Sequence, residues 1–129
     1  MPFELHVDDE RNHVTVHGRG NFEFQESSEM MVSVSRDPRY VPGMTLHIDL
    51  RDMEFVPTPD ETWRLALVFR SLKKSLTGKI AISVSNPLHY GLARIVSTYA
   101  GIGGIRIKPF MVAEEAHQWL DKEGDEDGQ

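Results

Sequence analysis

The chain contains no cysteine, so a disulfide framework, a cysteine nucleophile and a thiolate zinc site are all excluded. It also has no uninterrupted apolar run approaching about 18 residues, the length that a membrane-spanning helix needs. The first residues do not form a basic segment followed by an apolar one, so we expect no secretory signal. In the absence of these signals we expect a cytoplasmic location.

Basic charge is in short supply, with 14 basic against 20 acidic side chains and a net charge of −6. This balance disfavours nucleic acid and anionic lipid as partners. Much of the acidic excess lies near the C-terminus, where we expect residues 123–129 to form a disordered acidic tail. The remaining residues, 1–122, are enough for one domain that buries roughly two-thirds of its unfolded surface.

The N-terminal residues carry the pattern of a β-hairpin. Residues 3–8 and 13–19 each alternate between apolar and polar side chains, and turn-forming polar residues separate them. Pairing Asp8 with His13 sends the apolar side chains of both strands to one face. The sequence therefore predicts both the hairpin and its register.

The rest of the chain alternates between helical and extended patterns. Strands are predicted over residues 44–50, 80–84 and 105–107. Helices are predicted over residues 22–35, from Thr58 to a C-cap at Gly78, over residues 87–100 and over residues 112–120. The order β-β-α-β-α-β-α-β-α predicts a single α/β domain with a five-stranded, mostly parallel mixed sheet.

The strands of this sheet are not apolar throughout, as strands covered by helices on both faces usually are. Instead, the second face of the sheet would carry histidine, threonine, aspartate and serine side chains. We therefore expect the helices to cover one face more completely than the other. The polar face is then either solvated or used for contact.

Five segments together resemble one protein family: residues 16–20, 46–51, 58–61, 79–84 and 113–120. In their order and pattern they are similar to the SpoIIAA-like family, which has the STAS-like fold. The resemblance implies a non-catalytic binding or regulatory module in bacterial signalling. Members of the wider group switch between protein partners or bind nucleotides or lipids, and the SpoIIAA-like branch is largely uncharacterised.

Polar side chains follow the third and fourth predicted strands, in loops 51–58 and 86–91. Because the carboxyl ends of parallel strands meet at one edge of a sheet, these loops form a candidate binding surface. Its candidate residues are Asp49, Arg51, Asp52, Thr58, Asn86, His89 and Tyr90. The leading hypothesis is contact with a protein partner through this edge. The alternative is that Asp49 and Arg51 only pair with each other and that Asn86 only starts a helix.

Thr58 has two interpretations. The resemblance implies that it stands where the family keeps a phosphorylatable hydroxyl, and phosphate there would meet the positive end of a helix. However, Thr58-x-x-Glu61 with Pro59 is also a capping box, which explains the same residues without signalling. The family usually surrounds that hydroxyl with small residues, whereas Pro57 and Pro59 flank it here, and we favour the cap.

A different class of function is a carrier of a lipid or another small apolar ligand. Phe22, Phe24, Met30 and Met31 would line a pocket beneath the helix at 22–35, although such residues at helical spacing are more often plain core. An enzyme is not expected, because no nucleophile and base are arranged in a recognisable pattern. We also expect no cofactor, and self-association stays open.

Histidines raise the question of a metal site. His6, His17 and His47 would share the polar face of the sheet, and neutral imidazole is a common zinc ligand. No two histidines lie four residues apart on a predicted helix, as a His-Glu-x-x-His site requires, so we expect solvent-facing strand residues and no metal. The glycines at 101–104 follow a helix and precede a strand, the reverse of a dinucleotide-binding loop.

Overall fold

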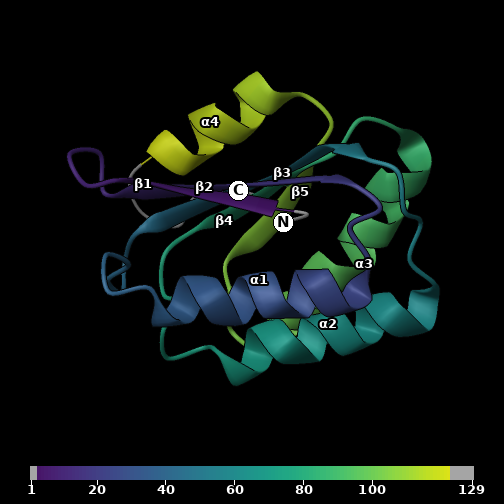
Figure 1. Cartoon of the computed structure of the whole chain (residues 1–129), viewed down its shortest axis with the longest axis horizontal. Coiled ribbons are helices and arrows are strands. Elements are labelled where there is room, and N and C mark those ends of the chain that lie inside the picture. The colour runs from purple at the N-terminus through teal and green to yellow at the C-terminus, as the bar shows by residue number, and fades with distance from the viewer. Residues whose placement is uncertain (1–2, 123–129) are drawn as a thin grey trace.

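Five strands form one sheet, and the computed structural model describes residues 3–122 of the chain (Figure 1). The strands are β1 (Phe3–Asp8), β2 (His13–Gly20), β3 (Thr45–Met53), β4 (Ile80–Ser83) and β5 (Ile107–Phe110). The helices are α1 (Phe24–Arg36), α2 (Pro59–Ser71), α3 (Pro87–Ile102) and α4 (Ala113–Asp121). This element order and the mixed sheet confirm the predicted fold class.

The hairpin has the predicted register. β1 and β2 are antiparallel, with Asp8 opposite His13 and Val7 opposite Val14. The turn between them places Asn12 at a positive φ of 56°, a conformation that asparagine tolerates better than most residues. Local alternation and turn chemistry were therefore sufficient to define this part of the sheet.

The strands lie in chain order, β1-β2-β3-β4-β5, and every pair after the hairpin is parallel. Because the order never reverses, right-handed crossovers place α1, α2 and α3 on the same face. α4 follows the last strand and lies on the opposite face (Figure 1). The helices thus cover the two faces unequally, as the alternating strands predicted, and there is no strand-order reversal of the kind that creates a ligand crevice.

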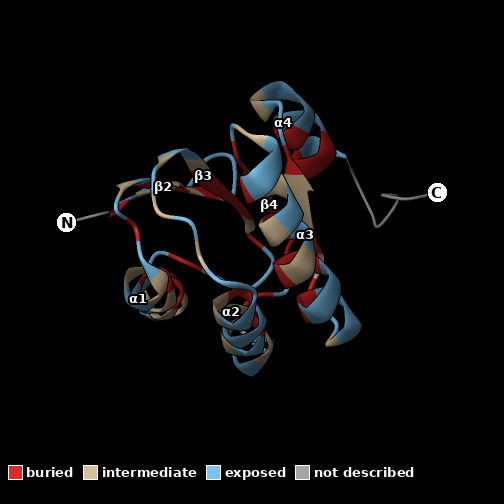
Figure 2. Ribbon diagram, turned by 90° about the vertical axis from the view of Figure 1, so that its right-hand side faces the viewer, coloured by how far each residue is buried: buried red, intermediate tan, exposed pale blue. Residues whose placement is uncertain are grey.

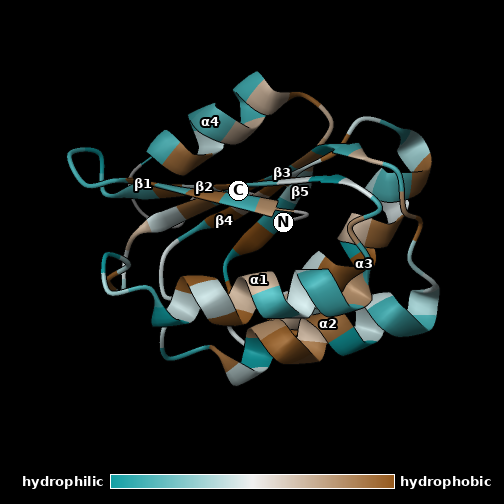
Figure 3. Ribbon diagram, viewed as in Figure 1, coloured by the Kyte–Doolittle hydropathy of each residue, from teal (hydrophilic) through white to brown (hydrophobic). Residues whose placement is uncertain are grey.

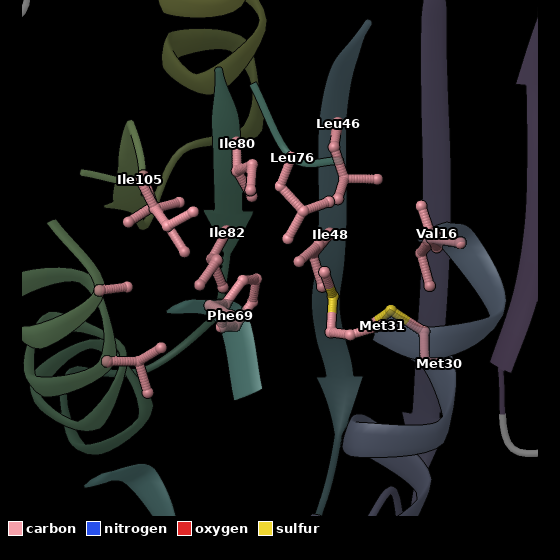
Figure 4. Packing of buried hydrophobic residues seen from close by; sticks show 14 of the residues in the cluster. Val16, Met30, Met31, Leu46, Ile48, Phe69, Leu76, Ile80, Ile82 and Ile105 are labelled. Carbon is pink, nitrogen blue, oxygen red and sulfur yellow. The ribbon is translucent and has the colours of Figure 1, made fainter. Parts of the chain in front are cut away.

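The main core lies between the sheet and its three-helix face. The apolar side chains of the strands meet the inward sides of α1 and α2, and the buried residues line the sides of the helices that face the sheet (Figures 2 and 3). A close view of the packing shows Val16, Met30, Met31, Leu46, Ile48, Phe69, Leu76, Ile80, Ile82 and Ile105 (Figure 4). Met30 and Met31 are therefore core residues.

α4 is fixed to the other face by a buried lysine. Lys79, immediately before β4, donates from Nζ to the carbonyls of Trp119 at 3.0 Å and Lys122 at 2.8 Å. These are carbonyls at the C-terminal end of α4, where a cation also complements the helix dipole. The smaller apolar cluster under α4 consists of Ala81, Phe110, Ala116, Trp119 and Leu120.

The predicted end of the second helix is wrong. α2 ends at Ser71, not at Gly78, and turns occupy residues 72–75. Gly78 is needed for another reason, because a β-carbon there would collide with the backbone carbonyl of Met44. A glycine that permits close approach of two segments looks the same in a sequence as a glycine that caps a helix.

Two further predictions need correction. β3 extends to Met53, because β2 continues to pair with it beyond an irregularity at Gly18, so the following loop is only residues 54–58. The helix predicted over residues 87–100 extends to Ile102 in α3, and its Leu88 and Tyr99 are exposed. Among the described residues, no helix combines the length and apolar character needed to cross a membrane.

Candidate functional site

The carboxyl ends of β3, β4 and β5 lie at one edge of the sheet, which we call the carboxyl rim. It comprises residues 51–58, 85–91 and 111–112. The predicted candidates in the first two segments do lie at the same edge. The third segment, between β5 and α4, was not included in the prediction.

Asp49 and Arg51 form a two-pronged ion pair at the end of β3. The Arg51 side chain donates to the Asp49 carboxylate at 2.9 and 2.8 Å, and the Arg51 amide donates to it at 3.1 Å. Burial alone would raise the pKa of Asp49, but these hydrogen bonds outweigh it and hold the pKa below its ordinary value. Asp49 and Arg51 therefore pair with each other, as the alternative interpretation in the sequence analysis stated.

Two further contacts join the rim to its neighbours. Ser85, two residues after the end of β4, donates from its hydroxyl to the Arg51 carbonyl at 3.0 Å. Asp52 lies 2.9 Å from Nε2 of His17 on β2. The sequence analysis placed His17 on the polar face but missed this partner, because the pairing of His17 with Asp52 depends on the irregularity in β2.

A chain of hydrogen bonds connects α3 to the loop before α2. Asn86 caps α3 by accepting from the amide of His89 at 2.8 Å, and its side-chain nitrogen lies 3.0 Å from Nδ1 of His89. Nε2 of His89 lies 3.0 Å from the carbonyl of Phe55. Because a carbonyl only accepts, Nε2 carries the proton and Nδ1 accepts from Asn86. Tyr90 packs partly buried against the core instead of joining this chain.

Thr58 forms the predicted capping box. Its hydroxyl accepts from the Glu61 amide at 3.1 Å, and the Glu61 carboxylate accepts from the Thr58 amide at 2.9 Å. Pro59 occupies the first turn of α2. The cap is therefore confirmed, and Thr58 is nevertheless an exposed residue.

Four exposed apolar side chains lie on the carboxyl rim, and others, such as Leu67 and Ile102, lie elsewhere on the described surface. Val56 is 46% exposed, Leu88 58%, Met111 43% and Val112 49%. Val56 follows Phe55 and Leu88 precedes His89, so both flank the hydrogen bond that joins the two loops. The sequence analysis did not single out any of these four residues. Leu88 lies in the first turn of α3, and in the same turn the next residue, His89, is buried.

No protein-family model matches the chain, and no curated protein does. Among the solved structures that match it, the following two cover most of the chain. An uncharacterised protein of the DUF3478 family from Shewanella loihica PV-4, described as having a SpoIIAA-like fold, is 14% identical, with a TM-score of 0.60 over 92% of this chain and 93% of that one. The anti-sigma factor antagonist SpoIIAA, in its unphosphorylated form, is 15% identical, with a TM-score of 0.55 over 92% of this chain and 96% of that one.

The chain has a SpoIIAA-like fold. The structural likeness establishes the arrangement of the elements. At identities of 14 and 15% it leaves activity open. The predicted resemblance is thus confirmed for the fold.

Beneath the rim of this SpoIIAA-like fold lies a small apolar cavity of about 60 Å³. Phe22, Phe24 and Phe55 line it with residues of α2 and α3, and His89 and Thr62 are among the polar side chains in its wall. Phe22 and Phe24 thus match the predicted pocket, whereas Met30 and Met31 do not line it. The volume is below the roughly 150 Å³ of a cavity that accepts benzene.

Histidines occupy the opposite, polar face of the sheet. His13 hydrogen-bonds Thr45 at 2.7 Å, and His47 hydrogen-bonds Ser83 at 2.7 Å while its ring meets that of His117 on α4 edge to face. Burial, and then the nearby His117, lower the pKa of His47 to about 4. Within residues 3–122, no group of three or more histidine or acidic side chains is arranged to hold a metal ion.

Proposed function

We propose that this chain is a non-catalytic regulatory module that binds a protein partner through the carboxyl rim. The observation that carries the proposal is the pair of exposed side chains Val56 and Leu88, each next in sequence to one of the two residues, Phe55 and His89, that hydrogen-bond each other. Exposed apolar side chains surrounded by polar ones are typical of a surface that becomes buried on binding.

The rigidity of the rim supports this role. Three separate hydrogen-bonded units hold it: Asp49 with Arg51, Thr58 with Glu61, and Asn86 with His89. Because the polar side chains are fixed before a partner arrives, little conformational entropy is lost on binding. The exposed Arg51 and Asp52 add charges of both signs at its border.

The same contacts argue against catalysis at the rim. Both ring nitrogens of His89 are engaged, one with Asn86 and one with the Phe55 backbone. The Asp49 carboxylate is held by Arg51. A general base needs a free nitrogen or oxygen within reach of substrate, and these groups are committed to holding the loops.

The fold comparison supports a protein as the partner. SpoIIAA is described as an antagonist of an anti-sigma factor, and we infer by analogy that this chain also acts by binding a protein. Thr58 then has a second use, because a phosphate on an exposed cap at a helix start would add negative charge beside Val56.

Photo-crosslinking in the native cell tests the proposal. A benzophenone amino acid at position 56 or 88 is expected to capture the same protein, and one at Glu10, exposed in the turn between β1 and β2 at the opposite end of the sheet, is expected not to. Capture from position 56 should fall in a chain that also carries Leu88→Asp. Equal capture from position 10, or different proteins from 56 and 88, would contradict a defined surface.

A second candidate function is supported by the apolar cavity. Its wall includes Phe55 of the 54–58 loop. The carbonyl of Phe55 accepts a hydrogen bond from His89 of α3. At about 60 Å³ the cavity is too small for a lipid chain, so a carrier role requires this loop to move outward.

Native mass spectrometry separates the two candidates. Freshly purified protein that carries an apolar ligand would show an added mass, which organic extraction would remove. A carrier is expected to lose this mass when the cavity is filled by Ala93→Leu and to keep it in Leu88→Asp. Unmodified protein at every preparation would leave only the protein-binding role.

A further inference from the structure

The two edges of the sheet differ in how well they are protected. β5 contains Pro109, which has no N–H to offer a further strand, and its Ile107 and Phe110 are buried. The described part of the opposite edge strand, β1, contains no proline, and its core-facing Leu5 and Val7 are only half-buried. Unprotected edges of this kind pair readily with another strand.

The backbone groups that β1 leaves unpaired follow from the geometry of its neighbour. The Asn12 carbonyl accepts from the Thr45 amide at 3.2 Å, so the even-numbered residues at the start of β2 face β3 and the odd-numbered ones face β1. By the observed register, the residues of β1 that bond to β2 are Glu4, His6 and Asp8. Those whose N–H and C=O groups point to the free edge are Phe3, Leu5 and Val7.

We propose that β1 pairs with β1 of a second copy of this chain, antiparallel and with the two Leu5 residues opposite each other on a two-fold axis. The two five-stranded sheets then join into one continuous sheet of ten strands. This interface lies at the side of the sheet, away from the carboxyl rim, and does not depend on the proposed function.

The choice of register follows from the number of backbone pairs. An antiparallel two-fold pairing that keeps apolar side chains on one face can be centred on Glu4, Leu5 or His6. Centred on Leu5, the pairing places Phe3 opposite Val7 and Leu5 opposite Leu5. All three residues whose N–H and C=O groups point to the free edge are then paired in each strand. In each of the other two registers, one residue whose N–H and C=O groups point to the free edge has no partner in the described β1 strand of the second copy.

Charge selects the same register. Centred on Leu5, the pairing places Glu4 of one copy opposite His6 of the other, at positions where side chains lie closest. Centred on Glu4, it would oppose two glutamates, and centred on His6 it would oppose Glu4 and Asp8, which are both acidic. The apolar side chains Phe3, Leu5 and Val7 of the two copies meet on the other face.

Sedimentation equilibrium of the whole chain tests the interface. Wild type is expected to form a dimer, and Leu5→Lys, which opposes two ammonium groups on the axis, is expected to raise its dissociation constant by more than about tenfold. The matched control is Leu67→Lys, an exposed leucine on α2, which should leave the constant unchanged. A monomer throughout the measured concentrations, or a dimer indifferent to Leu5→Lys, overturns the proposal.

A charge exchange tests the register. Glu4→Lys and His6→Glu are each expected to weaken the dimer by about 3- to 30-fold, since each changes two symmetric pairs. The double variant places a lysine opposite a glutamate across the axis and is expected to regain most of the affinity. A dimer strengthened by Glu4→Lys alone would indicate pairing with Asp8 and would overturn the Leu5-centred register. Thermal unfolding of each variant shows separately whether its monomer remains folded.

Discussion

Nε2 of His89 on α3 lies 3.0 Å from the backbone carbonyl of Phe55, and this contact joins the loop after β3 to the helix after β4. The same imidazole accepts from Asn86, so one side chain fixes a helix start and a neighbouring loop. The exposed Val56 and Leu88 are adjacent in sequence to the two bonded residues. The geometry of the proposed contact surface therefore depends on a buried histidine.

Replacing this histidine should loosen the loop. His89→Ala removes the donor to Phe55 and the partner of Asn86, and we expect a loss of about 1–3 kcal/mol in the free energy of unfolding. Hydrogen exchange should rise in residues 54–58. Gln118→Ala, at an exposed position on α4, is the control and should change neither quantity. Unchanged exchange in the loop of His89→Ala would show that packing alone holds it.

Variants of Thr58 separate the helix cap from a charge switch. Thr58→Ala should lower the free energy of unfolding by about 1 kcal/mol, because the Glu61 amide loses its acceptor, and Thr58→Ser should not. Thr58→Asp also caps well, so it should keep most of the stability while adding a negative charge. Reduced partner capture by Thr58→Asp alone would indicate a switch, and equal capture by all three would leave only the cap.

The hairpin register and the Thr58 cap could be predicted because both depend on residues close in sequence. The reason for a glycine at position 78 could not be predicted. The Met44 carbonyl that a β-carbon would meet lies on another segment and comes close to Gly78 only when β3 and β4 pair. The buried Lys79 was missed for the same reason, since its acceptors are carbonyls at the far end of the chain.

Stability should fall in mild acid because of His47. Its pKa is lowered from 6.5 to about 4 in the folded state, so the unfolded chain binds a proton more readily. Between pH 6.5 and about pH 4 this difference removes about 3 kcal/mol of stability, and none of the loss is present above pH 6.5. Urea unfolding should show that the free energies of unfolding of wild type and His47→Gln converge as the pH falls through this range. Parallel curves would mean that His47 titrates normally.

Gly78 should tolerate no side chain. A β-carbon there collides with the Met44 carbonyl, so Gly78→Ala should cost more than about 2 kcal/mol of unfolding free energy. Gly101, within α3, has open space around it, and Gly101→Ala should be neutral or stabilising by up to about 1 kcal/mol. Similar denaturation midpoints for the two variants would contradict the close approach.

The exposed residues of the rim show the limit of periodicity as a guide. Leu88 fits an apolar stripe along α3, but the buried face of that helix is formed by small residues such as Ala93 and Ala100. Small side chains allow close packing and give a weak periodic signal. The carboxyl edge as a place could be predicted from strand direction, whereas the identity of its exposed apolar residues required the tertiary structure.

The most direct test of the proposed contact surface compares two exposed leucines in quantitative affinity purification from the native cell. Leu88 lies on the carboxyl rim and is 58% exposed, and Leu67 lies on α2 and is 42% exposed. Each is replaced by aspartate. We predict that a partner recovered with wild type is lost from Leu88→Asp by at least about tenfold and kept by Leu67→Asp. Equal recovery with both variants, each shown to be folded, would contradict a binding surface at the carboxyl rim.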